Sequence, residues 1–272
     1  MDKIPASIAI LTLNSGQTLR RCLNSIKDFD DVYILDGNST DGTLAIAKEF
    51  NVPVYKQYDT EEPNVRIKNF TEIRMKADAL AKHDWIFWLD SDEYVSQVLV
   101  DDIRRILAAQ SSQKNAYYAQ KIMMMGDKEI KYSWHDSPYT MRLYNRQSGI
   151  VWKKSKAVHE KLFIPDDVRI VNIPHVCYSY FASFYREAVK KDNYYLSLVR
   201  QKMFLKNGLE KSNKLIIFSV IKNLLRAVNI FVKSVGVYAR HGFKHSLPPR
   251  HVWRFMRYHI IISWYRVRQL FC

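Results

Sequence analysis

Residues 1–90 alternate between short apolar runs and amphipathic segments, and this alternation restricts the fold more than any other feature of the chain. Apolar runs of strand length that alternate with helix-length segments are typical of β-α-β units, in which helices cover a parallel sheet. Because such crossovers are right-handed, we predict an α/β fold with a Rossmann-like, mainly parallel, doubly wound sheet. The expected strands are residues 7–13, 32–35, 52–55 and 85–89, and the expected helices are 18–27, 43–50 and 71–82.

Residues 117–174 are aromatic-rich and break into shorter pieces, which predicts antiparallel strands and loops. Residues from 185 onward are predicted to be helical. The chain contains neither G-x-G-x-x-G nor G-x-x-x-x-G-K-[ST], so the glycine-rich dinucleotide site and the P-loop are not expected.

Two carboxylates, Asp90 and Asp92, follow directly after the apolar run 85–89. Carboxylates at the end of a buried strand need a counter-charge, and Mg²⁺ or Mn²⁺ is commonly held by one or two carboxylates together with substrate phosphates. Ligands of open α/β sheets also bind at this end of the strands. The competing interpretation is that Asp90-Ser91-Asp92 is a solvated turn or a helix cap.

The second expected strand ends in Asp36, and the loop Asp36-Gly37-Asn38-Ser39-Thr40-Asp41-Gly42-Thr43 follows it. Helix capping explains Ser39 or Asp41 in this loop. It does not explain Asp36, which lies where the sheet opens. An acid there can accept a hydrogen bond from a nucleobase or a ribose hydroxyl.

These segments, in this order and spacing, resemble glycosyltransferase family 2. The matching pieces are the opening strand "SIAILTLN" from Ser7, "DGNSTDGT" from Asp36, "WIFWLDSDEYVS" from Trp85 and "VHEKL" from Val158. The resemblance covers about two thirds of the chain. Within the family, the chain resembles bacterial lipopolysaccharide inner-core β-glucosyltransferases. The resemblance implies the A-type glycosyltransferase fold and an inverting transfer from a nucleotide-diphosphate sugar, with a UDP-hexose as the expected donor and a surface glycan or lipid-linked acceptor.

The resemblance also implies roles for individual residues. The nucleotide-sugar site would use Thr12, Asn14, Asp36, Asn38, Arg74 and Asp90, although Met75 stands where the family often has an Asn after the Arg. The metal, Mg²⁺ or Mn²⁺, would be held by Asp92, with Asp90 and His159 as further ligands. Inversion needs a base for the acceptor hydroxyl, and Glu160 is the leading candidate and Asp136 the second. Arg142 either holds an anionic acceptor or is an ordinary packing arginine.

Charge is distributed unevenly along the chain. Residues 1–184 are balanced, so the net charge of +15 arises from residues 185–272, and no acidic residue follows Glu210. We therefore expect a catalytic domain at 1–184 and a basic helical region at 185–272, with an anionic surface as partner. The three cysteines have no metal-ligand spacing and indicate a reducing compartment, and residues 8–13 are too short for a signal-peptide core. A recognised nucleic-acid-binding motif is missing, so nucleic acid is not an expected partner.

The segment 215–237 is long and apolar enough to suggest a membrane span. Lys222, Arg226, Asn229 and Lys233, however, form one helical stripe, and each central basic residue costs about 2.5–3.5 kcal/mol in a bilayer. We therefore expect an amphipathic helix in the membrane interface, on the inner face of the cytoplasmic membrane. A helical bundle packed on the catalytic domain and a homodimer interface are the alternatives.

Three other functions compete with glycosyl transfer. A nucleotidyltransferase of sugar phosphates would bring a glycine-rich, basic loop after the first strand, where this chain has Asn14-Ser15-Gly16-Gln17. A phosphatase of the haloacid dehalogenase type would place its Asp-x-Asp on the first strand. A non-catalytic membrane scaffold would not need Asp36, Asp90, Asp92 and Glu160 together.

Overall fold

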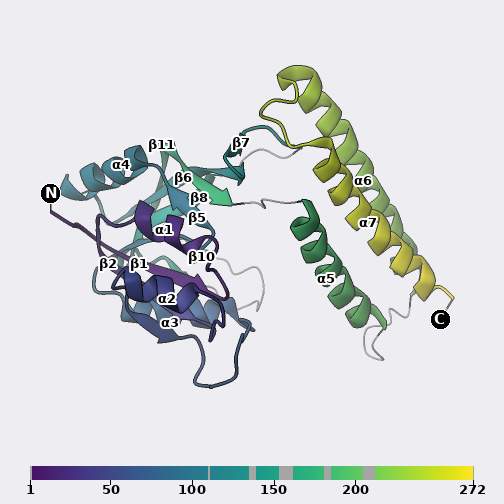
Figure 1. Ribbon diagram of the computed structural model, residues 1–272. Coiled ribbons are helices and arrows are strands. Elements are labelled where there is room, and N and C mark those ends of the chain that lie inside the picture. Colours follow the sequence, from purple (N-terminus) through teal and green to yellow (C-terminus); the bar gives the residue numbers. More distant parts are fainter. Residues whose placement is uncertain are drawn as a thin grey trace. The chain divides into compact units, whose positions relative to one another are not determined.

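The computed structural model describes residues 2–109, 111–134, 139–152, 162–180, 185–204 and 212–271. The chain divides into two compact units, one made of residues 1–122 and 138–180 and the other of 123–137 and 181–272. The expected division at residue 184 differs from this one because residues 123–137 group with the helical unit. Figure 1 shows both units, with most of their elements labelled.

The first unit begins with the expected α/β alternation. Its elements are β1 (Ile4–Thr12), α1 (Leu19–Ser25), β2 (Phe29–Asp36), α2 (Thr43–Glu49), β3 (Val54–Lys56), α3 (Phe70–Leu80) and β4 (Trp85–Phe87). The strands lie in the order β3-β2-β1-β4, and all three pairs are parallel. The predicted α/β fold is therefore confirmed, with element boundaries shifted by at most three residues.

The rest of the sheet is built mainly from antiparallel pairs. It contains β5 (Glu93–Val95), β6 (Asn115–Met125), β8 (Tyr139–Asn145) and β11 (Arg169–Tyr180), and β8 pairs antiparallel with both β4 and β6. The order continues β4-β8-β6-β11-β5, and β7 (Lys128–Ile130) pairs with the end of β6. Helix α4 (Gln97–Ala108) and the pair β9 (Val151–Trp152) and β10 (Leu162–Phe163) complete the elements. The antiparallel strands expected within 117–174 are confirmed.

Strand β1 is buried on both faces and joins two hydrophobic layers. Ile8 and Ile10 pack on one face with residues of α1, α2 and α4, and Ala9 packs on the other face with Ile73 and Ala77 of α3. This double burial explains why the strand reads as a continuous apolar run. It also fixes the carboxyl ends of β1, β2 and β4, where the candidate site residues lie.

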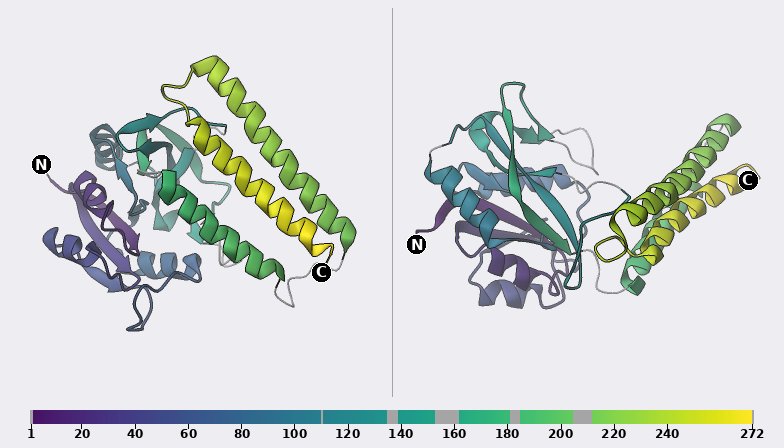
Figure 2. Two further views of the ribbon diagram at one scale, coloured as in Figure 1. Left: turned by 45° about the vertical axis from the view of Figure 1, so that its right-hand side comes forward. Right: turned by 90° about the horizontal axis from the view of Figure 1, so that it is seen from above.

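The second unit contains three long helices, α5 (Tyr185–Phe204), α6 (Asn213–His241) and α7 (Pro249–Gln269). Helices α6 and α7 form an antiparallel hairpin, because His259 Nδ1 lies 3.0 Å from Asn223 Oδ1 and Ser263 Oγ donates to the Val220 carbonyl at 3.3 Å. Gln269 Nε2 donates to the Met203 carbonyl at 2.8 Å and ties the ends of α7 and α5 together. Figure 2 shows the three helices side by side, with α7 between the other two.

Candidate active site

Asp36 links the carboxyl ends of β1 and β2. Its side chain is buried, and Oδ1 accepts hydrogen bonds from Thr12 Oγ1 and Ser39 Oγ, each at 2.6 Å. Oδ2 accepts the Ser39 backbone N–H at 2.7 Å. A carboxylate oxygen can accept about two hydrogen bonds. Asp36 therefore holds the loop in place and keeps one acceptor position on Oδ2 for a further donor.

Two asparagines extend this network across the loops. Asn14, with a positive φ of 52°, donates its backbone N–H to Ser39 Oγ at 2.8 Å and its side-chain Nδ2 to Asn64 Oδ1 at 2.8 Å. Asn38, with φ of 57°, donates Nδ2 to the carbonyls of Thr60 and Glu62. Asn38 therefore positions the 60–62 loop, while Asn14 stays exposed at the edge of the site.

Gly37 allows the chain to approach closely at this point. A Cβ atom on residue 37 would lie 2.5 Å from the Val65 carbonyl oxygen, which is too short for any side chain. The backbone N–H of Val65 also donates to the Gly37 carbonyl at 2.8 Å. The loop therefore requires glycine here to bring residues 60–65 beside the end of β2.

The second part of the site is the turn that follows β4. Arg74 of α3 is buried, donates Nη2 to Asp90 Oδ1 at 2.8 Å, and lies over the Trp88 ring at 4.6 Å from its centroid. The Asp90 side chain is 45% exposed. Ser15 Oγ lies 2.9 Å from Ser91 Oγ, so the turn and the β1 loop meet at the same edge of the sheet.

Glu93 holds this turn in place through buried hydrogen bonds and ion pairs. It is 1% exposed, accepts two hydrogen bonds from Arg142, at 2.5 and 3.1 Å, and lies 2.7 Å from Lys121 Nζ. It also accepts the Asp90 backbone N–H at 3.2 Å. Burial alone would raise the pKa of Glu93, but Arg142 and Lys121 outweigh it and hold the pKa at about 2. Glu93 is therefore ionised at any physiological pH and fixes the backbone of the Asp90–Asp92 turn.

Arg142 fits its packing interpretation. Its guanidinium is buried and neutralised by Glu93, and Nη1 also donates to the Trp88 carbonyl at 3.2 Å. Both cationic partners of Glu93 come from distant strands, Lys121 from β6 and Arg142 from β8. The pairing of Glu93 with Lys121 and Arg142 has no signal in the sequence, because a lone acid and a lone lysine show their pairing only after the strands are placed.

A cavity of about 390 Å³ opens beside Asp90. Its lining includes Trp88, Tyr118, Lys121 and Leu162, so two aromatic rings and an amine surround a mainly apolar wall. A larger cavity of about 710 Å³ lies at the start of β4 and is lined by His83, Asp84 and Trp85. Neither Asp90 nor Asp92 lines it. The cavity of about 390 Å³ is therefore the one that adjoins the candidate site, because Asp90 lines it.

The turn residues fit a divalent cation that is completed by substrate oxygens. Asp90 and Asp92 are both partly exposed, and the backbone carbonyl of Asp92 accepts the Tyr180 N–H at 2.8 Å, which fixes the end of the turn. Across the described parts of the chain, no group of three or more His, Cys, Asp or Glu side chains could hold a metal by itself. Two carboxylates plus phosphate oxygens are a common Mg²⁺ arrangement.

Three predicted site residues, Asp136, His159 and Glu160, lie outside the described residues. The other predicted residues separate into two linked groups. Thr12, Asn14, Asp36 and Asn38 share one hydrogen-bond network, and Arg74, Asp90 and Asp92 belong to the turn after β4. The structure thus brings together at one sheet edge residues that are up to 80 positions apart in the chain.

A family model, described as glycosyl transferase family 2, matches residues 7–192. The chain belongs to glycosyltransferase family 2. It is therefore a glycosyltransferase of a nucleotide-sugar-using family, as the motifs at Ser7, Asp36 and Trp85 predicted. The match includes the whole of the sheet edge described above.

Two curated relatives and one solved structure are similar to this chain over most of its length. A glycosyltransferase of Rickettsia bellii is 27% identical over 249 residues, covering 89% of this chain and 81% of its own. The lipopolysaccharide core biosynthesis glycosyltransferase LpsC of Rhizobium meliloti is 22% identical, covering 90% of this chain and 96% of its own. Among solved structures, S. aureus TarS 1-349 in complex with UDP is 17% identical with a TM-score of 0.47, and the similarity covers 99% of this chain and 90% of that one.

Proposed function

We propose that this family 2 enzyme transfers a hexose, with inversion, from a uridine-diphosphate sugar to a lipopolysaccharide-type or other surface-glycan acceptor. The observation that carries the proposal is the junction of two groups at one sheet edge, the Thr12–Asp36 network and the Asp90–Asp92 turn, linked through Ser15 and Ser91. The Thr12–Asp36 network offers an oxygen that can accept a hydrogen bond from the nucleobase or the ribose. The Asp90–Asp92 turn offers carboxylates for a metal ion bound to the diphosphate. The likeness to LpsC supports the acceptor class.

Arg74 and the turn carboxylates would serve the leaving diphosphate. A bound Mg²⁺ or Mn²⁺ would supply positive charge to the phosphate oxygens as the sugar–phosphate bond breaks. Asp92 and Asp90 would hold that ion. Arg74 is fixed by Asp90 and by the Trp88 ring, so its guanidinium needs little reorganisation to add further charge.

The cavity of about 390 Å³ would receive the transferred sugar and the attacking hydroxyl. Trp88 and Tyr118 offer aromatic faces for the C–H face of a hexose, and Asp90 places the cavity next to the diphosphate. Lys121, 30% exposed, can reach a sugar or acceptor oxygen while it remains paired with Glu93. Specificity for the sugar would therefore depend on Trp88, Tyr118 and Lys121.

Donor binding is the first test of this function. A ligand at a hundred times its Kd stabilises a protein by about 2.7 kcal/mol. We expect UDP-glucose or another UDP-hexose, with Mn²⁺, to raise the melting temperature of the full chain by several degrees. ADP- and GDP-sugars should give smaller shifts, and omission of Mn²⁺ should reduce the effect. Equal shifts with sugar-1-phosphates and nucleoside triphosphates would instead indicate a nucleotidyltransferase.

The identity of the base is a separate prediction. An inverting transfer needs a carboxylate that removes the acceptor proton, and we propose Glu160 for this role and Asp136 as the alternative. A positioned general base contributes about 10²–10⁴-fold to rate. Glu160→Gln should therefore lower turnover by about a hundredfold or more, while the donor should still raise the melting temperature as it does for the wild-type protein. Asp136→Asn is the matched control, and a larger loss with Asp136→Asn would transfer the role to Asp136.

A further inference from the structure

The α6–α7 hairpin buries polar residues and exposes apolar ones. Asn223, Ser234 and Ser263 are at most 7% exposed within the helical unit. Phe231 of α6 and Trp264 of α7 are 54% and 60% exposed. A helix pair in water normally shows the reverse arrangement, with its apolar stripe inside. Large exposed apolar patches mark surfaces that another molecule covers.

One set of exposed apolar residues on α6 is defined by its position next to the buried stripe. A residue lies about 100° further round a helix than the one before it, because an α-helix has 3.6 residues per turn. The residues of α6 that are buried along its α7-facing stripe are Asn223, Ala227, Ile230 and Ser234. The residue that follows each of them is apolar and at least 44% exposed: Leu224, Val228, Phe231 and Val235.

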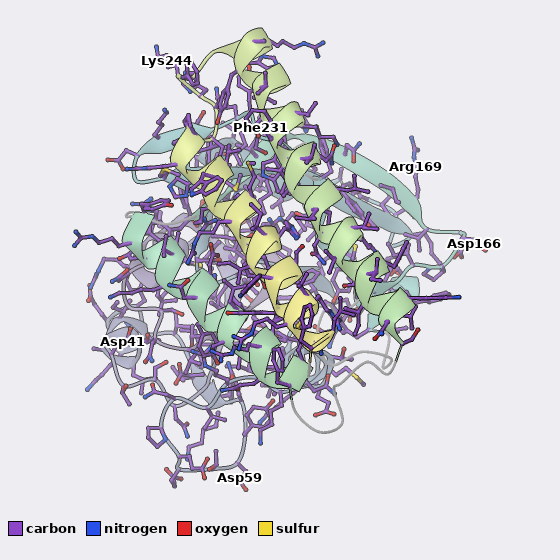
Figure 3. All side chains as sticks on the ribbon, turned by 90° about the vertical axis from the view of Figure 1, so that its right-hand side faces the viewer. Asp41, Asp59, Asp166, Arg169, Phe231 and Lys244 are labelled. Carbon is purple, nitrogen blue, oxygen red and sulfur yellow. The ribbon has the colours of Figure 1, made fainter. Side chains whose placement is uncertain are left out.

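Helix α7 shows the same arrangement. Val252, His259 and Ser263 contact α6, and each is followed by an exposed apolar residue: Trp253, Ile260 and Trp264. Because the two helices are antiparallel, the same rotation turns the following residues of both helices to one side. The hairpin therefore has a continuous apolar face on that side. Figure 3 views the three helices with Phe231 labelled.

Basic residues border this apolar face. Arg257 and Arg268 each lie four residues after a face tryptophan, on the adjoining turn of α7. Arg257 Nη1 contacts Asn193 Oδ1 of α5 at 3.3 Å, so the Asn193 stripe of α5 adjoins the same face. That stripe includes Lys190 and Arg200, at spacings of three and seven residues, and both are exposed.

The other side of α6 carries the basic stripe that the sequence predicted. Lys222, Arg226 and Lys233 each precede a residue of the buried stripe, so they turn to the side opposite the apolar face. The two sides of α6 are therefore chemically distinct. One side is basic, and the other is apolar up to the basic border on α7 and α5. Phe218, Leu225 and Val232, each two positions after a buried residue, are exposed on the outward face of α6 between these two sides.

We propose that the apolar face of α6 and α7, with its basic border, docks flat onto a bilayer that contains anionic lipids. Tryptophans are favoured at the membrane interface, and nearby Lys and Arg are attracted by anionic headgroups at about 1 kcal/mol each. A second copy of the chain is a poorer occupant, because pairing two such faces would bring two basic borders together.

The hairpin docks in the plane of the bilayer and does not cross it. Within the described part of the chain, α6 is long and apolar enough to cross a membrane by length and composition, and 22% of its most apolar stretch is buried. However, α7 packs along α6 and carries Arg254, Arg257, Arg266 and Arg268. A spanning α6 would draw these charges into the hydrocarbon, at about 2.5–3.5 kcal/mol each.

Vesicle flotation of the full-length protein tests this surface without reference to turnover. We expect binding to phosphatidylcholine vesicles that contain phosphatidylglycerol and weak binding to phosphatidylcholine alone. Leu224→Gln/Val228→Gln/Phe231→Gln should weaken binding at least about tenfold, because it removes apolar area that enters the interface. Leu44→Gln/Val98→Gln/Ile170→Gln, three exposed apolar residues of the catalytic unit, should bind like wild type. Equal binding by both triple variants would overturn the proposal.

A charge-matched pair tests the orientation. Lys190→Gln/Arg200→Gln/Arg268→Gln removes three charges from the border of the apolar face, and Lys222→Gln/Arg226→Gln/Lys233→Gln removes three from the opposite side of α6. The border variant should bind severalfold more weakly than the other. An equal or reversed order would contradict the orientation, and retention in the membrane after alkaline extraction would show a span. A dimer of the full chain that becomes monomeric in the Leu224→Gln/Val228→Gln/Phe231→Gln variant, without vesicle binding, would assign the face to self-association.

Discussion

Asp92→Asn is expected to lower glycosyl transfer at least about a thousandfold, because a metal on the leaving oxygens supplies several kcal/mol of charge stabilisation. Asparagine keeps the size of the side chain and one oxygen but loses the negative charge. The backbone of the turn should survive, since Glu93 and Tyr180 hold it through main-chain hydrogen bonds at Asp90 and Asp92. The loss should therefore be in metal affinity and turnover, with little change in melting temperature.

Mn²⁺ binding measured by electron paramagnetic resonance, in the presence of UDP, separates this effect from misfolding. Asp101→Asn, an exposed acid on α4, serves as the matched control and should bind Mn²⁺ and turn over normally. Asp90→Asn is a less clean variant, because it also breaks the ion pair with Arg74. Near-normal turnover and Mn²⁺ binding in Asp92→Asn would show that Asp92 is not a ligand.

The parallel half of the sheet could be predicted because its signals are local. Each β-α step in residues 1–90 carries its own apolar period, and β1 reads as a buried strand from Ser7 to Leu13 without any knowledge of its neighbours. The end of β4 was less accurate. The apolar run continues to Leu89, but the strand ends at Phe87. The Trp88 backbone N–H still donates to the Arg142 carbonyl of β8 at 2.6 Å, while the Trp88 ring lies against Arg74 and Leu89 packs in the core.

The candidate site was predictable where residues follow strands and not where it depends on pairing between distant strands. Thr12 and Asp36 are the last residues of β1 and β2, and Asp90 lies three residues after the end of β4, so the sheet brings them to one edge. The support beneath them was not predictable. Glu93 meets Lys121 and Arg142 only after β5, β6 and β8 are arranged, and single charged residues in strands carry no local signal of their partners.

The helical region shows the same limit. The stripe of Lys222, Arg226 and Lys233 follows from helical spacing and is present in α6. The shared apolar face of α6 and α7 depends on which residues of each helix contact the other, and on the antiparallel direction of the pair. Sequence periodicity gives a stripe on each helix, but the joining of two stripes into one face requires the packing.

Glu93→Gln is expected to destabilise the catalytic unit by about 3–5 kcal/mol, because it leaves the buried charge of Arg142 without its counter-ion. Arg142→Met should cost a similar amount for the converse reason. The double variant Glu93→Gln/Arg142→Met should cost clearly less than the sum, since the only charge in this network that loses its partner is Lys121, which is 30% exposed and can reach solvent. Lys121→Met is the graded control, because Lys121 is 30% exposed and Arg142 only 5%. Additive losses in urea unfolding would show that the two residues do not act as a pair.

The same network sets an acid limit on stability. The pKa of Glu93 is about 2 in the folded protein against an ordinary value of 4.5 in the unfolded chain, so the unfolded chain binds this proton more readily. The stabilisation is full above pH 4.5 and is lost as the pH falls through about 2, and it amounts to about 3 kcal/mol. Urea unfolding of the wild-type protein between about pH 5 and pH 2, the range that these two pKa values define, should show this loss of stability. The double variant lacks the ionisable group, so its stability should fall less over the same range, and an identical slope would exclude Glu93 as the source.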